Sequence, residues 1–168
     1  MSSSPERQAY FDELITSATS TLHSDEVLLA NLAGEATDFI RLNNNEVRQA
    51  GSVDQQKLSV DLIAGQRHVG GTINLTGDTA MDNARVGALL GQLRAQRRLV
   101  PDDPYLLYNT DPTSTDNVKT GEIPSPETAL ADIRAAGQGK DLVGIYASGD
   151  TFHGFANSLG QRNWFQSS

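Results

Sequence analysis

The feature that most constrains this chain is a regular alternation of apolar and polar residues from residue 57 to residue 75. Leu58, Val60 and Leu62 alternate with polar residues, which is the period of a strand with one face in the core and the other in water. After a turn candidate at Gly65–Gln66, the alternation continues for another strand length. Consecutive hairpins of this kind predict an antiparallel meander.

Strand-like segments also precede this region. Val27–Ala33 and Ala36–Leu42 are rich in apolar residues and are separated by Gly34–Glu35, so we expect them to form a hairpin that breaks at the glycine. Asn43–Asn45 predicts a second turn, because asparagine tolerates the left-handed backbone better than most residues. A mostly polar strand, Val47–Val53, is expected to follow it.

Capping residues and apolar stripes predict three helices. Ser4 and Pro5 suit the start of the first, which carries apolar residues on one stripe. Thr79 and Asp82 have the spacing of a capping box and open the second. Ser125–Glu127 opens the third, which ends near a glycine-rich stretch. Helices beside a meander indicate an α+β (mixed α/β) fold.

A long connection, residues 99–124, separates the second and third helices. It is rich in Pro, Asp, Asn and Thr, and structureless loops longer than about 15 residues are either functional or linkers. The apolar run Tyr105–Tyr108 is expected to pin it to the body of the domain. We therefore divide the chain into a helix–meander–helix unit (1–100), a long loop (101–124) and a segment (125–168) that starts a second β-rich unit.

The end of the chain predicts further strands. Leu142–Ser148 and Thr151–Ser158 are expected to pair about a turn at Gly149–Asp150, and Gln161–Gln166 begins another strand. A lone strand there would leave an open sheet edge and expose Trp164 and the phenylalanine after it. We therefore expect either that the chain is a fragment or that a partner covers its end.

Charge and composition exclude several classes of protein. Thirteen Lys and Arg against 21 Asp and Glu give a net charge of −8, which argues against binding to nucleic acid or anionic lipid. No apolar run approaches the roughly 20 residues of a membrane span. The absence of cysteine excludes thiolate metal sites and cysteine nucleophiles and suits a reducing compartment. Because Met1–Arg7 also lacks the pattern of a secretory signal, we expect a cytoplasmic protein.

The three histidines do not form a metal motif. None lies within four residues of another and no His-Glu-x-x-His helix is present, so a zinc site made by this chain alone is not expected. His68 is predicted to be solvated or hydrogen bonded, and His23 to follow the first helix. His153, beside Phe152 and Phe155, is the histidine most open to a functional role, although a structural role is favoured.

Other candidate groups also favour structural readings. Ser148 lacks the Gly-x-Ser-x-Gly elbow of a nucleophile. A solvated acidic loop is favoured over a calcium site for Asp111, Asp116, Asn117 and Glu122. Surface positions, and not a nucleic-acid track, are predicted for the scattered Arg41, Arg48, Arg67 and Arg85. The residues therefore assign no catalytic, cofactor-binding or metal-binding group.

Two pairs of segments resemble a known family. Asp38–Ser52 with Leu58–His68, and Asp141–Gly149 with Gly154–Trp164, resemble the N-terminal part of TldD/PmbA proteins, also called modulators of DNA gyrase. The resemblance implies an α/β N-terminal domain followed by a larger β-rich domain, in a family of dimers that includes metal-dependent peptidases. Peptidase subunits of that family carry a downstream His-Glu-x-x-x-His zinc motif, which this chain lacks, so no catalytic residue is transferred.

Three functions follow as hypotheses. The first is a non-catalytic N-terminal module of a TldD/PmbA-type protein linked to metal-dependent proteolysis. Such a module would pack on a C-terminal domain and a homo- or hetero-dimer partner subunit and help to enclose a peptide, with any zinc held by the full-length parent or its partner. The second is a free-standing binding or dimerisation domain with an open sheet edge. The third is a small hydrolase that uses His153.

Overall fold

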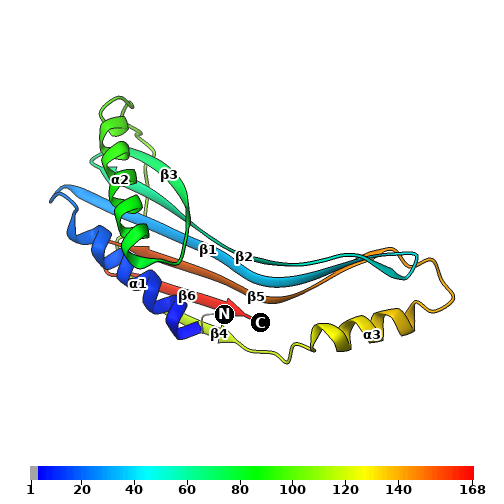
Figure 1. Cartoon of the computed structure of the whole chain (residues 1–168). Coiled ribbons are helices and arrows are strands. Elements are labelled where there is room, and N and C mark those ends of the chain that lie inside the picture. Colours follow the sequence, from blue (N-terminus) through cyan, green and yellow to red (C-terminus); the bar gives the residue numbers. More distant parts are fainter. Residues whose placement is uncertain (1–3) are drawn as a thin grey trace.

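The computed structural model describes residues 4–168 and has the predicted α+β fold (Figure 1). Within this range, three helices accompany one six-stranded sheet with the strand order β3-β2-β1-β5-β6-β4. In chain order the elements are α1 (Ser4–Ser20), β1 (Glu26–Asn43), β2 (Glu46–Ala64), β3 (Arg67–Leu75), α2 (Thr79–Arg97), β4 (Thr115–Lys119), α3 (Pro126–Ala136), β5 (Gly144–Asn157) and β6 (Arg162–Ser167). Met1 to Ser3, part of the segment used to argue against a secretory signal, lie outside the described residues.

The hairpin expected at Gly34 is wrong, because β1 runs through this glycine without a break. Gly34 lies opposite Gln56 on β2 and Phe152 on β5. A Cβ atom added to Gly34 would lie 2.2 Å from Cζ of Phe152, which is closer than non-bonded carbon atoms can approach. The glycine therefore makes room for an aromatic ring inside a strand and does not start a turn.

The turn expected at Gly149–Asp150 is wrong for a similar reason. β5 is continuous through this position, where Gly149 pairs with Thr37. Its φ of +146° is one that L side chains rarely adopt, and a Cβ atom there would lie 2.2 Å from the carbonyl oxygen of Ala36. Both glycines that we took for turns are thus places where two strands, or a strand and a ring, approach closely.

The turns predicted on either side of β2 are confirmed. Asn44 and Asn45 have φ values of +50° and +57° and join β1 to β2, which is the left-handed pair that a two-residue hairpin requires. Gly65 has a φ of +60° and joins β2 to β3. The meander β1-β2-β3 is antiparallel throughout.

Helices α1 and α2 cover one face of the sheet at one end, and the core lies beneath them (Figure 1). β1 places its even-numbered residues on this face, where most are buried, and its odd-numbered residues on the other. The other half of the long strands, residues 36–53 and 144–150, extends beyond α1 and α2 toward α3 (Figure 1), and we call it the arm. Leading members of the core are Phe11, Leu14, Ile15, Leu28, Leu32, Leu58, Leu62, Leu90, Phe152 and Trp164.

Trp164 is buried, which corrects the expectation of an exposed final strand. It is 3% exposed and lies 5.9 Å from the ring of Phe152 and 6.4 Å from that of Phe11, measured between centroids. β6 is also not an edge, because β4, a strand that we did not predict inside the long connection, pairs with it in parallel. All of β4 is exposed, so it carries no apolar pattern from which it could have been found.

Asp82 does not complete a capping box with Thr79. The N-cap of α2 is Asp78, whose side chain accepts a hydrogen bond from the backbone N–H of Met81. Asp82 is fully buried and accepts hydrogen bonds from the backbone N–H of Thr76 at 2.9 Å and from the Tyr10 hydroxyl at 2.6 Å. Its carboxylate thus ties α1 and α2 to the end of β3.

A second buried carboxylate, Glu26, fixes the start of β1 to the last turns of α2. Arg94 Nη2 donates to Glu26 Oε2 at 2.8 Å and Arg97 Nη1 donates to Oε1 at 3.0 Å. Burial raises the pKa of Glu26, but the bonds from Arg94 and from the His23 backbone outweigh this effect and lower the pKa to about 2. No helix of the described part of the chain is long and apolar enough to cross a membrane.

Candidate functional site

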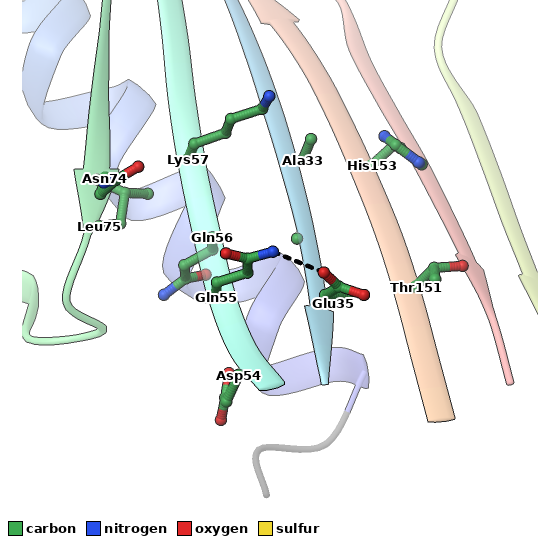
Figure 2. Close-up of a pocket in the computed structure, with 11 residues that line it drawn as sticks. Ala33, Glu35, Asp54, Gln55, Gln56, Lys57, Asn74, Leu75, Thr151 and His153 are labelled. Carbon is green, nitrogen blue, oxygen red and sulfur yellow. Dashed lines mark hydrogen bonds between the residues drawn. The ribbon is translucent and has the colours of Figure 1, made fainter. Parts of the chain in front are cut away.

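The sheet face opposite α1 and α2 carries an open groove of about 510 Å³ (Figure 2). Ligand sites commonly have volumes of about 300–1,000 Å³. The groove spans β3, β2, β1 and β5, and its lining includes Ala33, Glu35, Gln55, Lys57, Asn74 and His153. The groove is therefore a ligand-sized hollow on the sheet face that lies opposite α1 and α2.

Strand register places Lys57, Ala33 and His153 side by side. Ala33 on β1 pairs with Lys57 on β2 and with His153 on β5, and Lys57 pairs with Asn74 on β3. We call this set the Lys57 row. The small Ala33 forms the floor, and the Cα atoms of Lys57 and His153 are about 10 Å apart across it. Figure 2 shows the Lys57 side chain reaching over β1 toward this floor.

A second row lies two residues further along each strand. Glu35 pairs with Gln55 on β2 and with Thr151 on β5, and we call this set the Glu35 row. Gln55 Nε2 donates to Glu35 Oε1 at 2.6 Å, and the Thr37 hydroxyl donates to Oε2 at 3.3 Å. A carboxylate can accept about four hydrogen bonds, so Glu35 is held in place while it retains the capacity to accept a ligand N–H.

The positive charge of Lys57 in the groove has no ion-pair partner among the described residues. No carboxylate of residues 4–168 lies within ion-pair distance of the exposed Lys57 ammonium. His153 is exposed, and its ring contacts Phe165 with 6.5 Å between centroids. Glu35 and Asp54 supply negative charge at the other end of the groove. The groove thus offers one free cation beside acceptors for N–H groups.

The segment 99–114 crosses the same face, and we call it the crossing segment. At one side Asp103 lies 3.5 Å from His68, which also contacts Asp61 at 3.1 Å. At the other side Asn163 Nδ2 donates to the carbonyl of Thr113 at 2.9 Å. His68 is therefore hydrogen bonded, as predicted, and the segment is attached by polar contacts on both sides.

The apolar run Tyr105–Tyr108 is partly buried at alternate residues only, Leu106 and Tyr108. Tyr105 is 89% and Leu107 is 92% exposed. Polar contacts attach the segment as well, since Arg67 pairs with Asp102 at 2.6 Å. Two residues of the run are thus partly buried, and the other two point to solvent.

The structure does not join the other candidates into a site. His23 lies 3.7 Å from Glu26, and Ser148 lines a small cavity of about 170 Å³ with no histidine on its wall. The acidic candidates of the long connection are exposed, and no group of three or more His, Asp or Glu among the residues described could hold a metal ion. The residues present do not fit a zinc site, so we derive no step through zinc for this chain.

The four arginines singled out in the sequence do not form one track, although Arg41 and Arg48 line the same cavity of about 360 Å³. Arg41 lies over the Phe39 ring at 5.6 Å, and Arg85 contacts Asp82 at 3.3 Å. Sequence reasoning missed Lys57 and Glu35, which it treated only as the wet side of a strand and as part of a turn. The remaining signal, one lysine on a polar strand face that also carries Asp61, is too weak to single it out.

Comparisons with known proteins add a likeness of fold. No family model matches this sequence, and no curated protein matches it. Among solved structures, TldE from Thermococcus kodakarensis superposes with a TM-score of 0.64 at 16% identity, over 94% of this chain and 37% of that one. A candidate modulator of DNA gyrase from Bacteroides thetaiotaomicron gives a TM-score of 0.63 at 14% identity, over 96% and 38%.

A third structure, a candidate modulator of a DNA gyrase from Thermotoga maritima, has a TM-score of 0.59 at 10% identity, over 96% of this chain and 37% of that one. The resemblance to TldD/PmbA proteins read from the sequence is confirmed at the level of the fold. The chain spans a little over a third of the length of each of these structures.

Proposed function

We propose that this chain is a non-catalytic N-terminal module of a TldD/PmbA-type protein, which holds peptide for metal-dependent proteolysis carried out elsewhere in the assembly. The observation that carries the proposal is the fold match over 94–96% of this chain and only 37–38% of the matched proteins. A β-rich C-terminal domain and a partner subunit, either of which could bear zinc, complete the proposed assembly.

The uncovered sheet face supports a role in holding peptide. Extended peptides are recognised through arrays of polar groups set by the strand repeat, and the groove presents two such rows. The net charge of −8 remains unfavourable to nucleic acid. No arrangement of nucleophile and base lies at the groove in the described chain, which is why cleavage is assigned to another part of the assembly.

Peptide binding and cleavage are measured separately to test the proposal. A fluorescein-labelled unstructured peptide of about ten residues is titrated with the 168-residue chain, and its anisotropy is followed. The same peptide is incubated with this chain and with the product of the complete natural reading frame, each with and without a chelator. We expect the chain to bind without cleaving, and chelator-sensitive cleavage only with the longer product or its partner. Cleavage by the chain alone, or no binding, would contradict the proposal.

A dimerisation domain is the second candidate, and the free edge of β3 favours it. Arg67–Leu75 pairs with β2 on one side, and no backbone hydrogen bond of the described residues joins its other side to a further strand. Such an edge can pair with another copy. Light scattering distinguishes the candidates: a species of twice 18.1 kDa at micromolar concentration favours dimerisation, whereas an 18.1 kDa monomer that binds peptide favours the first proposal.

A further inference from the structure

We infer that the groove recognises the free C-terminal carboxylate of an extended peptide, with Lys57 as the carboxylate-binding residue and the Glu35 row as acceptor for a peptide N–H. This inference rests on the proposed role in holding peptide and names the part of the peptide that is held. The pairing of charges, the spacing of the two rows and the position of the crossing segment support it.

The charge pattern selects a ligand with a single negative charge and adjacent donors. Lys57 is unpaired within the described chain, whereas Glu35 and Asp54 line the same groove. A phosphate or another dianion would gain one cation but would meet two carboxylates, and like charges at this range repel. A peptide terminus fits better, because its one carboxylate can pair with Lys57 while its N–H groups face Glu35.

The spacing of the rows matches an extended peptide. The Lys57 row and the Glu35 row are two residues apart on β1, which corresponds to about 6.8 Å along an antiparallel strand. Backbone groups of an extended ligand repeat at the same interval. A peptide that lies along β1 with its carboxylate above Ala33 therefore brings an N–H of its own backbone over Glu35.

The crossing segment, which is attached one row beyond the Lys57 row, favours a chain terminus over an acidic side chain. The next row beyond Lys57 contains Ser59, Asn31 and Phe155, and none of these residues lines the groove. That row also reaches Asn163, the residue that attaches the crossing segment. A peptide seated at Lys57 can continue past Glu35 toward the arm, but in the other direction it meets the crossing segment.

The test uses three versions of one unstructured, fluorescein-labelled peptide without internal acidic residues. The first has a free C-terminal carboxylate, the second a C-terminal amide, and the third an amide together with one internal Glu. We expect the free acid to bind about tenfold more tightly than the amide, since a charge-assisted hydrogen bond is worth about a factor of ten or more in affinity. The internal Glu is expected to restore little of the loss.

Two variants with the same change of charge locate the effect. In Lys57→Gln the preference for the free acid is expected to fall to about twofold or less. Lys140→Gln, which alters an exposed lysine outside the groove, is expected to keep the full preference. Because Lys57 is exposed, neither variant is expected to change the midpoint of thermal unfolding, and circular dichroism checks this.

The outcomes separate the inference from the proposed function. Equal binding of acid and amide by the unaltered chain would overturn the carboxylate site and leave peptide holding intact. Restoration of full affinity by the internal Glu would overturn the assignment to a chain terminus. Retention of the preference in Lys57→Gln would overturn the assignment to this residue. Failure to bind any of the three peptides would overturn the proposed function and, with it, the inference.

Discussion

The substitution Glu26→Gln tests how much the buried carboxylate stabilises the fold. The Glu26 side chain is 0% exposed, and its partners Arg94 and Arg97 are 21% and 15% exposed. A fall in the pKa of Glu26 from 4.5 to about 2 corresponds to about 3 kcal/mol at roughly 1.4 kcal/mol per pH unit. Since solvent reaches the two arginines and screens the pair, we expect a loss of about 2–3 kcal/mol at pH 7.

The sign of the pH dependence follows from the lowered pKa. The carboxylate is ionised more readily in the folded chain than in the unfolded one, so its stabilisation is present above the unfolded pKa of 4.5. As the pH falls from 4.5 toward about 2, this stabilisation is lost, because the folded carboxylate also takes up a proton. Glutamine resembles the protonated acid, so the difference between the two proteins should shrink below about half its pH 7 value at about pH 3.

Urea denaturation at pH 7, 5 and 3 measures the loss of stability at pH 7 and its decrease at low pH. For 168 residues, a loss of 2–3 kcal/mol corresponds to a fall of about 6–9 °C in the thermal midpoint at pH 7. Glu13→Gln, at an exposed position of α1, is the matched control, and we expect a change within about 0.5 kcal/mol. A loss that is the same at pH 7 and pH 3, or no loss at all, would refute the assignment to an ionised buried carboxylate.

Three further predictions concern two buried contacts and one open helix position. Asp82→Asn should cost about 2–4 kcal/mol in urea denaturation. It should also lower the pKa of Tyr10, which burial and the hydrogen bond to Asp82 both raise; an unchanged phenol titration at 295 nm would count against the bond. Gly34→Ala should destabilise the fold by about 1–3 kcal/mol, because the new methyl group meets the Phe152 ring. Gly87→Ala, in α2 with open space around it, should instead stabilise by about 0.5–1 kcal/mol, and a loss there would contradict the open environment.

The continuity of β1 was available in the sequence, although the glycine hid it. A two-residue turn at Gly34–Glu35 would pair residue 33 with residue 36, and would therefore put Leu32 on the same face as Thr37. The buried residues on the far side of the glycine are instead Ala36 and Ile40, which keep the even numbering of Leu32. When buried residues keep the same alternation on both sides of a glycine, the segment is one strand. This alternation is a better guide here than the presence of the glycine.

No such signal existed for β5. Its large apolar residues switch from odd-numbered to even-numbered positions along the strand. Ile145 is odd-numbered and 67% exposed, whereas Phe152 is even-numbered and buried. The change arises because the half of β5 in the arm turns an apolar residue to solvent, and the other half faces α1. From the sequence alone, the shift in apolar positions predicts two strands separated by Gly149. Only the tertiary structure distinguishes an exposed apolar residue from a buried one.

The groove could not be predicted because it is a consequence of register among three strands. Lys57, Ala33 and His153 are 24 to 120 residues apart in sequence. Of the three, only His153 stands out in the sequence, and nothing there links it to Lys57 or Ala33. Their neighbours Leu58, Leu32 and Phe152 are buried on the opposite face. A slip of one residue in any strand would turn its core residue to water and its groove residue toward the helices. The hydrophobic core thus fixes the register, and the register in turn sets Lys57 beside Ala33, so the proposed binding face is specified by residues that lie outside the groove.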